Sequence, residues 1–253
     1  MFNHAIVRKP CKAMVKGLTA AKLGTPDYAL AQQQHQDYVV ALRECGLQVT
    51  ELEALEDYPD SCFVEDVALI TPKGAILTHP GAPSRRGEVD CIESTIKQFF
   101  PYPDYIDAPG HVEAGDIMMV GGHFYIGLSA RTNRQGAAQM ISLLRKQGLS
   151  GSMVTMSELL HLKTGLSYLE NNNLLTFGEM HCHPDFSDYH RIEISAAESY
   201  AANSVWINGT VLVPKGFPIA LAAIQALGYK TREVAMSEFQ KLDGGLSCLS
   251  LRF

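Results

Sequence analysis

The sequence lacks the marks of several protein classes. No apolar run comes near the roughly 18 residues that a transmembrane helix needs. The opening residues, from Met1 to Arg8, contain no apolar stretch typical of a signal peptide, so we expect a cytoplasmic protein without membrane contact. Basic residues are outnumbered, 21 against 27 acidic ones, and the net charge of -6 argues against a nucleic-acid partner.

Cysteine pairs at metal-binding or redox spacing are also missing. The six cysteines are scattered and include no C-x-x-C pair, which predicts neither a disulfide framework nor a zinc finger. His181, His183 and His190 flank Cys182 in a stretch typical of a loop. Because no second cysteine pair accompanies them, we do not expect a metal there.

What is present is an ordinary globular composition with a recurring pattern of strands and helices. The chain is 46% hydrophobic and 19% charged, and its length allows one large domain or two small ones. A helix from Asp27 to about Cys45 is closed by Gly46. We predict hairpins over 59–78, 112–128, 161–177 and 203–214, helices over 86–100, 133–147 and 218–227, and a strand at the chain end that pairs with the first strand.

One polar residue stands at a similar place in the first strand of each predicted unit. These residues are Glu65, Glu113, His161, Asn203 and Cys248, with successive spacings of 48, 48, 42 and 45 residues. Such a period is typical of repeat architectures, and repeats around an axis would bring the five side chains to one central cavity. An open α/β sheet is the alternative arrangement of the same elements.

Cys248 and His161 are a candidate nucleophile and acid/base pair. Gly244 and Gly245 allow a tight turn before a predicted strand that carries Cys248. A cysteine attacks as its thiolate, and a nearby imidazole can protonate a leaving group. The thiol could equally be a small buried hydrophobe, and the residues alone leave both interpretations open.

Charged residues follow the same units. Clustered carboxylates either bind a metal or hold a cation by charge-assisted hydrogen bonds, and a planar guanidinium suits several of them. Arg85 and Arg131 follow two successive hairpins, and arginine forks suit a carboxylate ligand. Solvated surface positions are the alternative for each of these residues. The acids concerned are Glu65, Asp66, Glu113 and Asp116.

Four segments resemble the dimethylarginine dimethylaminohydrolase family, most closely its bacterial form. They are residues 63–66 (FVED), 113–117 (EAGDI), 161–165 (HLKTG) and 243–248 (DGGLSC). The resemblance covers essentially the whole chain, so it implies a single catalytic domain over residues 1–253. The family belongs to the guanidine-modifying superfamily, which implies an α/β fold: a five-bladed α/β propeller, the pentein fold, of ββαβ units around a central active-site cavity.

The resemblance also implies a role for individual residues. Cys248 matches the nucleophile, His161 the general acid/base and Glu113 the acid that orients His161. Arg85 and Arg131 match the pair that binds the substrate α-carboxylate. The other implied substrate contacts are Asp60, Phe63, Glu65 and Asp66, together with Leu18 in a loop, residues 17–26, that closes over the substrate, and the backbone of Leu18 and Leu242 around the α-amino group.

The implied activity is hydrolysis of asymmetric dimethylarginine or monomethylarginine to L-citrulline. Dimethylamine or methylamine leaves, a covalent cysteine thiouronium forms as intermediate, and neither a metal nor an organic cofactor is required. The alternatives are an arginine deiminase-like hydrolase, an amidinotransferase, or an inactive binder of arginine analogues; the first two families have longer chains. The expected partner is the small-molecule substrate, and a homodimer is an open hypothesis because the sequence does not determine the oligomeric state.

Overall fold

The computed structural model describes all 253 residues, and the contacts among them define two compact units. The first unit comprises residues 1–64 and 165–253, and the second comprises residues 65–164. Each unit is described by itself below. That the whole chain acts as one catalytic domain stays a prediction. No helix in either unit combines the length and the apolar character needed to cross a membrane.

The same three-stranded sheet occurs five times. In each sheet the first strand pairs antiparallel with the second, and the second pairs parallel with the third. The first unit holds β15 (Leu251–Arg252), β1 (His4–Arg8) and β2 (Gln48–Leu52); β9 (Leu166–Tyr168), β10 (Asn173–Thr176) and β11 (His190–Glu193); and β12 (Val205–Ile207), β13 (Thr210–Pro214) and β14 (Lys230–Val234). The second unit holds β3 (Ala68–Thr71), β4 (Gly74–Leu77) and β5 (Asp104–Tyr105), and β6 (Ile117–Val120), β7 (His123–Leu128) and β8 (Ser150–Thr155).

A helix makes the parallel crossover in four of the five sheets. A parallel strand pair cannot be joined by a tight turn, so the chain needs such a connection. The crossover helices are α1 (Tyr28–Glu44), α2 (Asp90–Phe99), α3 (Arg134–Lys146) and α5 (Pro218–Ala226). Between β10 and β11 two 3-10 turns, η5 (Gly178–Met180) and η6 (Pro184–Phe186), replace the helix. The predicted ββαβ pattern is therefore confirmed in four units.

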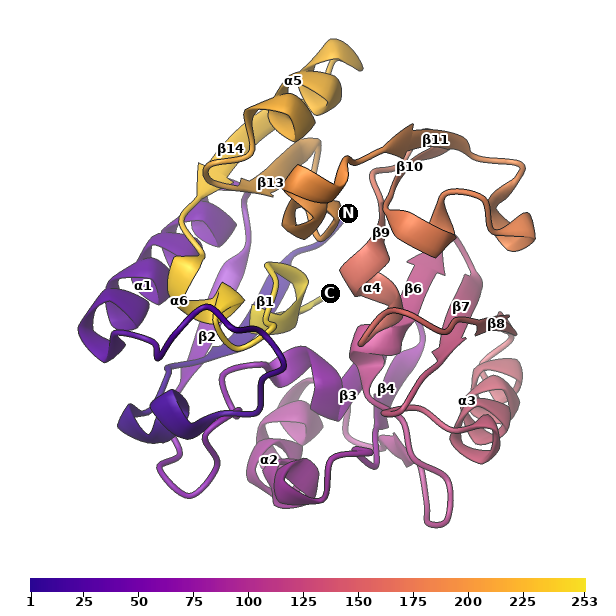
Figure 1. Cartoon of the computed structure of the whole chain (residues 1–253). Helices are drawn as coiled ribbons and strands as arrows, with labels where there is room; N and C mark the ends of the chain where they lie inside the picture. Colours follow the sequence, from indigo (N-terminus) through magenta and orange to yellow (C-terminus); the bar gives the residue numbers. More distant parts are fainter. The chain divides into compact units, whose positions relative to one another are not determined.

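Local signals set the ends of α1 as the sequence predicted. The Asp27 side chain accepts a hydrogen bond from Leu30 N at 3.0 Å, and Gly46 has a φ of +89°, which favours glycine. Tyr38 and Leu42 lie on the buried face, which packs in the core of the first unit. Figure 1 shows α1, in violet, alongside β2.

The helix α3 anchors the second unit in a similar way. Asn133 caps its first turn through Gly136 N at 2.7 Å. Met140 and Leu144 are fully buried and pack with Phe124 of β7 in the core of this unit. Figure 1 shows α3 beside β7 and β8, the two strands that it connects.

The chain end differs from the prediction. Cys248 does not lie on a strand but in a 3-10 turn, η8 (Ser247–Leu249), and only Leu251–Arg252 are extended. The Cys248 N–H closes this turn on Gly245 O at 3.2 Å, and such a local bond overrides the alternating apolar pattern. The predicted pairing with the first strand is confirmed, with Ile6 opposite Leu251. In this sheet β15 is at the edge and β1 is central.

Candidate active site

The five polar residues at matching positions in the repeats were predicted to lie on strands, but they do not. Each lies in or next to a short helical turn, two to five residues before the first strand of its sheet. Glu65 belongs to η2 (Val64–Val67), Glu113 precedes η4 (Ala114–Asp116), and His161 precedes α4 (Leu162–Gly165). Asn203 ends η7 (Ala196–Ala202), and Cys248 lies in η8. The predicted period was correct, but the backbone form at these positions was not.

In the second unit, Glu113 contacts His161. Glu113 Oε2 lies 3.0 Å from His161 Nε2, and the Glu113 side chain is fully buried. Its other oxygen, Oε1, accepts the backbone N–H of Ala82 at 2.9 Å. The carboxylate is thus bonded on both sides, once to the imidazole and once to the backbone; the role of Glu113 in orienting His161 stays a prediction.

The charges around His161 keep the imidazole protonated at neutral pH. Burial by itself lowers the pKa of His161, but the negative charges of Asp116 and Asp66 and the bond to Glu113 outweigh it. Together they raise the pKa of His161 to about 9. At neutral pH the group is therefore an imidazolium, ready to give a proton to a leaving group.

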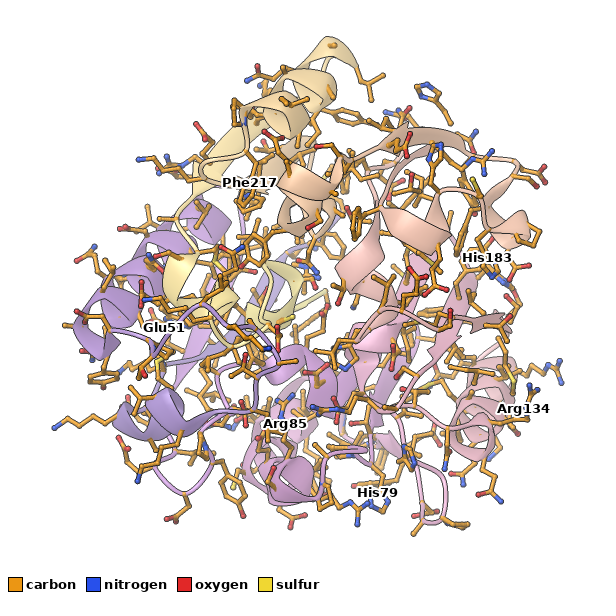
Figure 2. The ribbon with its side chains drawn as sticks, viewed as in Figure 1. Glu51, His79, Arg85, Arg134, His183 and Phe217 are labelled. Carbon is orange, nitrogen blue, oxygen red and sulfur yellow. The ribbon has the colours of Figure 1, made fainter.

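Asp66 lies in the same cluster, paired with a buried guanidinium. Arg85 donates to Asp66 through Nη1 and to Glu88 through Nη2, the latter at 2.8 Å. Burial raises the pKa of Asp66, but the Arg85 and His161 charges reverse this and hold it below its usual range. Figure 2 labels Arg85 in η3 (Pro83–Glu88), ahead of α2.

A glycine is required between these groups. A Cβ at Gly115 would lie 2.7 Å from Asp66 Oδ1 and 3.0 Å from His161 Nδ1, closer than side chains tolerate. The Gly115 N–H also donates to Asp66 Oδ1 at 3.0 Å. Close approach of backbone to two functional side chains therefore explains the glycine in the EAGD segment.

The two arginines of the predicted carboxylate clamp have different surroundings. The Arg131 side chain is 21% exposed, and its Nη1 lies 3.2 Å from Glu113 Oε1. The Arg85 side chain is only 5% exposed and pairs with two carboxylates. Arg131 thus offers more of its surface to a ligand, while Arg85 holds Asp66 in place. The clamp role of both stays a prediction.

Two residues outside the predicted set also belong to this cluster. Asp116 accepts Leu162 N at 2.9 Å and the Ser129 hydroxyl at 2.7 Å, so it anchors the chain right after His161. Lys163 forms an ion pair with Glu65 at 2.6 Å. The sequence analysis included Asp116 among the clustered acids but gave it no role. For Lys163, its position two residues after His161 was the only sign in the sequence that it lies near the site.

Asp66, Glu113 and His161 also meet the distance condition for a metal site. Their ligand atoms lie within 4.8 Å of one another. A metal ligand must be an unprotonated imidazole, whereas His161 retains its proton at neutral pH and its Nε2 is bonded to Glu113. Asp66 already accepts from Arg85 and from Gly115 N. The donor set therefore suits proton transfer and cation binding better than metal coordination.

In the first unit, Cys248 lies in the turn formed by residues 243–248, here called the cysteine turn. The Gly245 N–H points to Cys248 Sγ at 3.4 Å. Ser247 N–H donates to Asn203 Oδ1 at 3.0 Å, and the Tyr200 hydroxyl donates to Gly244 O at 2.7 Å. The cysteine is half-buried.

The remaining predicted residues of the first unit gather around the loop of residues 17–26. Asp60 Oδ1 accepts Leu18 N at 3.0 Å, and a Cβ at Gly17 would lie 3.3 Å from Leu242. Phe63 packs against Gly244 of the cysteine turn, where a Cβ would lie 2.1 Å from its ring. Leu18 itself is 41% exposed.

The loop has a further anchor that sequence reasoning missed. Asp243, which has a φ of +58°, accepts Ala20 N at 2.6 Å and the Thr19 hydroxyl at 3.1 Å. The loop is thus held at Leu18 by Asp60 and at Ala20 by Asp243. The sequence signal was weak, because an aspartate before Gly-Gly is usual in a turn.

Comparisons with known proteins identify relatives of this chain. A family model described as eukaryotic N,N dimethylarginine dimethylhydrolase matches residues 24–168. The N(G),N(G)-dimethylarginine dimethylaminohydrolase of Pseudomonas aeruginosa is 55% identical, and the alignment covers 100% of both chains.

Two solved structures of such enzymes match with a TM-score of 0.99, 55% identity and 100% coverage of each chain. One is a histidine-to-glycine variant as an adduct with S-methyl-L-thiocitrulline, and the other is a cysteine-to-serine variant from Pseudomonas aeruginosa complexed with citrulline. The predicted fold class, a five-bladed α/β propeller, is confirmed. The chain belongs to the dimethylarginine dimethylaminohydrolase family.

Proposed function

We propose that the protein carries out the reaction of its family: it is a hydrolase that converts Nω-methylated arginines to L-citrulline and methylamine or dimethylamine. The observation that carries the proposal is His161, a buried imidazolium with a pKa of about 9, bonded to Glu113 in a cluster of carboxylates. A guanidine loses its amine only if the departing nitrogen receives a proton, and this group has one to give.

The carboxylate cluster suits a cationic substrate. In the second unit the cluster contains four anions and three cations, which leaves one negative charge. The anions are Asp66, Glu88, Glu113 and Asp116, and the cations are Arg85, Arg131 and His161. A guanidinium would balance that charge in a largely buried place where Coulomb interactions are strong. Asp66 and Glu113 would accept the N–H groups of the guanidinium.

In the proposed reaction, the Cys248 thiolate attacks the guanidinium carbon and forms a tetrahedral adduct. His161 transfers its proton to the methylated nitrogen, and the C–N bond breaks to release the amine. An S-alkylthiouronium remains on Cys248. The His161 imidazole, now neutral, takes a proton from water as the water attacks the thiouronium carbon. The C–S bond then breaks and the remaining hydroxyl proton passes to solvent, which yields citrulline and restores the thiolate and the imidazolium.

The amino-acid end of the substrate would be held by two arginine side chains and by backbone groups. Arg85 and Arg131 would bind the α-carboxylate. The backbone of Leu18 and Leu242 would receive the α-amino group, and Asp60 would hold Leu18 in position through its backbone N–H. In this proposal the loop of residues 17–26 closes over the substrate and excludes water until the covalent step.

One experiment tests the function and separates it from its rivals. The purified protein is given arginine, monomethylarginine or asymmetric dimethylarginine, and citrulline and the released amine are measured together. We expect citrulline with methylamine or dimethylamine from the methylated substrates. Ammonia release from arginine at a higher rate would make the protein a deiminase, and no citrulline from any substrate would make it a binder of arginine analogues.

Two variants test the residue roles within the same assay. Cys248→Ser should stop turnover, since a hydroxyl is a far weaker nucleophile than a thiolate. His161→Gly should block amine release in a single turnover. Retention of more than a few per cent of the native rate by either variant would remove that residue from the proposed mechanism.

The oligomeric state and location belong to this proposal as well. A homodimer and a cytoplasmic location are the states we propose. Light scattering after size-exclusion chromatography tests the first, and cell fractionation tests the second.

A further inference from the structure

The direction of one backbone N–H matters for the reactivity of Cys248. The Gly245 N–H points to Cys248 Sγ at 3.4 Å, within the reach of a hydrogen bond to sulfur. A donor to sulfur favours the charged thiolate over the neutral thiol. The turn that sets this direction contains two adjacent glycines, so its backbone would be free to adopt other conformations unless side chains hold it.

Asn203 holds this turn with both ends of its amide. Its Oδ1 accepts Ser247 N–H at 3.0 Å, and its Nδ2 donates to Ser247 Oγ at 3.0 Å. A Cβ at Gly245 would lie 2.5 Å from the Asn203 amide, so the Gly245 backbone rests directly on it. Asn203 is buried, and its hydrogen bonds are therefore stronger than bonds in water.

Tyr200 holds the turn from the same segment, three residues earlier. Its hydroxyl donates to Gly244 O at 2.7 Å. Burial, and then the charge of Cys248, raise the pKa of Tyr200 well above its usual value, so the phenol remains a donor at working pH. Its ring lies 5.7 Å from that of Phe217, which Figure 2 labels near the start of α5. The η7 segment thus supplies two anchors for one turn.

We propose that Asn203 is a positioning residue for the nucleophile: it fixes Ser247 and Gly245 so that the Gly245 N–H aims at Cys248 Sγ. It acts through the cysteine turn. Asn203 stands at the fourth of the five matching repeat positions, where the others are Glu65, Glu113, His161 and Cys248. This inference rests on the proposed nucleophile role of Cys248 and adds the residue that prepares it.

The test compares Asn203→Ala with Ser204→Ala, a matched control. Ser204 is the next residue, is also buried, and its hydroxyl donates to Ala201 O at 2.8 Å. The resting enzyme is alkylated with iodoacetamide across a pH series without substrate. Trypsin then releases residues 242–252, a peptide in which Cys248 is the single cysteine, so mass spectrometry follows this thiol despite the five others.

We expect the midpoint of the Cys248 alkylation profile to rise by about one pH unit in Asn203→Ala, because the thiolate loses its aligned donor. The kcat for dimethylarginine should fall about tenfold while KM stays within about threefold, since the same aligned thiolate is needed in the transition state. Ser204→Ala should match the native protein in all three. A role in packing alone would lower the melting temperature and leave the alkylation midpoint unchanged.

A second variant covers the case in which Asn203→Ala does not fold. Asn203→Ser keeps a small polar group at the position but is too short to bond the Ser247 N–H, so the midpoint should again rise by about one unit. A native midpoint in either folded variant overturns the positioning role. This failure is distinct from failure of the proposed function, which would appear as citrulline production by Cys248→Ser.

Discussion

Replacing Asp116 by asparagine tests the origin of the high pKa of His161. Asp116 makes the largest contribution among the charges that raise this pKa, followed by Asp66 and Glu113. Asparagine has the same shape and keeps an oxygen for Leu162 N, which Asp116 Oδ1 accepts at 2.9 Å. The substitution therefore removes one charge while the backbone after His161 remains anchored.

The size of the effect follows from the shift itself. The pKa of His161 rises from 6.5 to about 9 although burial lowers it, so the raising contributions together exceed the net change. We expect the largest of them to account for about one unit, or about 1.4 kcal/mol. The imidazolium is the acid form, so native activity should fall as the pH rises through about 9, and the variant should lose activity about one unit lower.

Two measurements check this expectation. The basic limb of the kcat profile gives the pKa in the complex, and NMR titration of histidine ring carbons gives it in the free enzyme. The His161 signal is identified among those of the nine histidines as the one that is missing in His161→Gln. Asp104→Asn, which removes an acid bonded to Gln147 instead, is the control and should leave both values unchanged. An unchanged titration of His161 in Asp116→Asn would refute the electrostatic explanation.

Four further predictions concern stability, packing, recognition and motion. Burial lowers the pKa of His35 to about 4, so the folded protein favours the neutral imidazole. The free energy of unfolding should therefore fall as the pH drops below 6.5, by about 2 kcal/mol between pH 7.5 and 5 in urea unfolding. In His35→Gln this part of the pH dependence should be absent. Gly115→Ala should lower kcat at least about tenfold by steric overlap, whereas Gly122→Ala, with no atom nearer than 3.8 Å to its Cβ, should be neutral. Arg131→Ala should weaken use of methylarginine by about 2–5 kcal/mol in kcat/KM and change agmatine, which lacks the carboxylate, very little; equal losses on both would make the residue structural. Hydrogen exchange of residues 17–26 should slow with citrulline bound, and unchanged protection at saturation would mean a fixed wall instead of a lid.

Much of the fold was accessible from local signals. The Asp27 cap and Gly46 set both ends of α1, and the Asn208-Gly209 turn joins β12 to β13 as predicted. Capping, turn chemistry and apolar periodicity act over a few neighbouring residues, so a sequence displays them directly. Two short strands were missed, β5 and β11, because each pairs parallel with its neighbour and so no hairpin turn marks it in the sequence.

The sequence by itself determined which residue types recur at the repeat period, and so identified Glu113, His161 and Cys248 as a set. Tertiary structure alone decided what those residues do to one another within each unit. It turned the expected cysteine strand into a 3-10 turn, paired Arg85 with Asp66, and gave Asn203 its bonds to Ser247. The pKa of His161 likewise depends on burial and on charges from Asp66, Glu113 and Asp116, which lie 45 to 95 residues away along the chain. Such energies depend on distances through space, which no local pattern encodes.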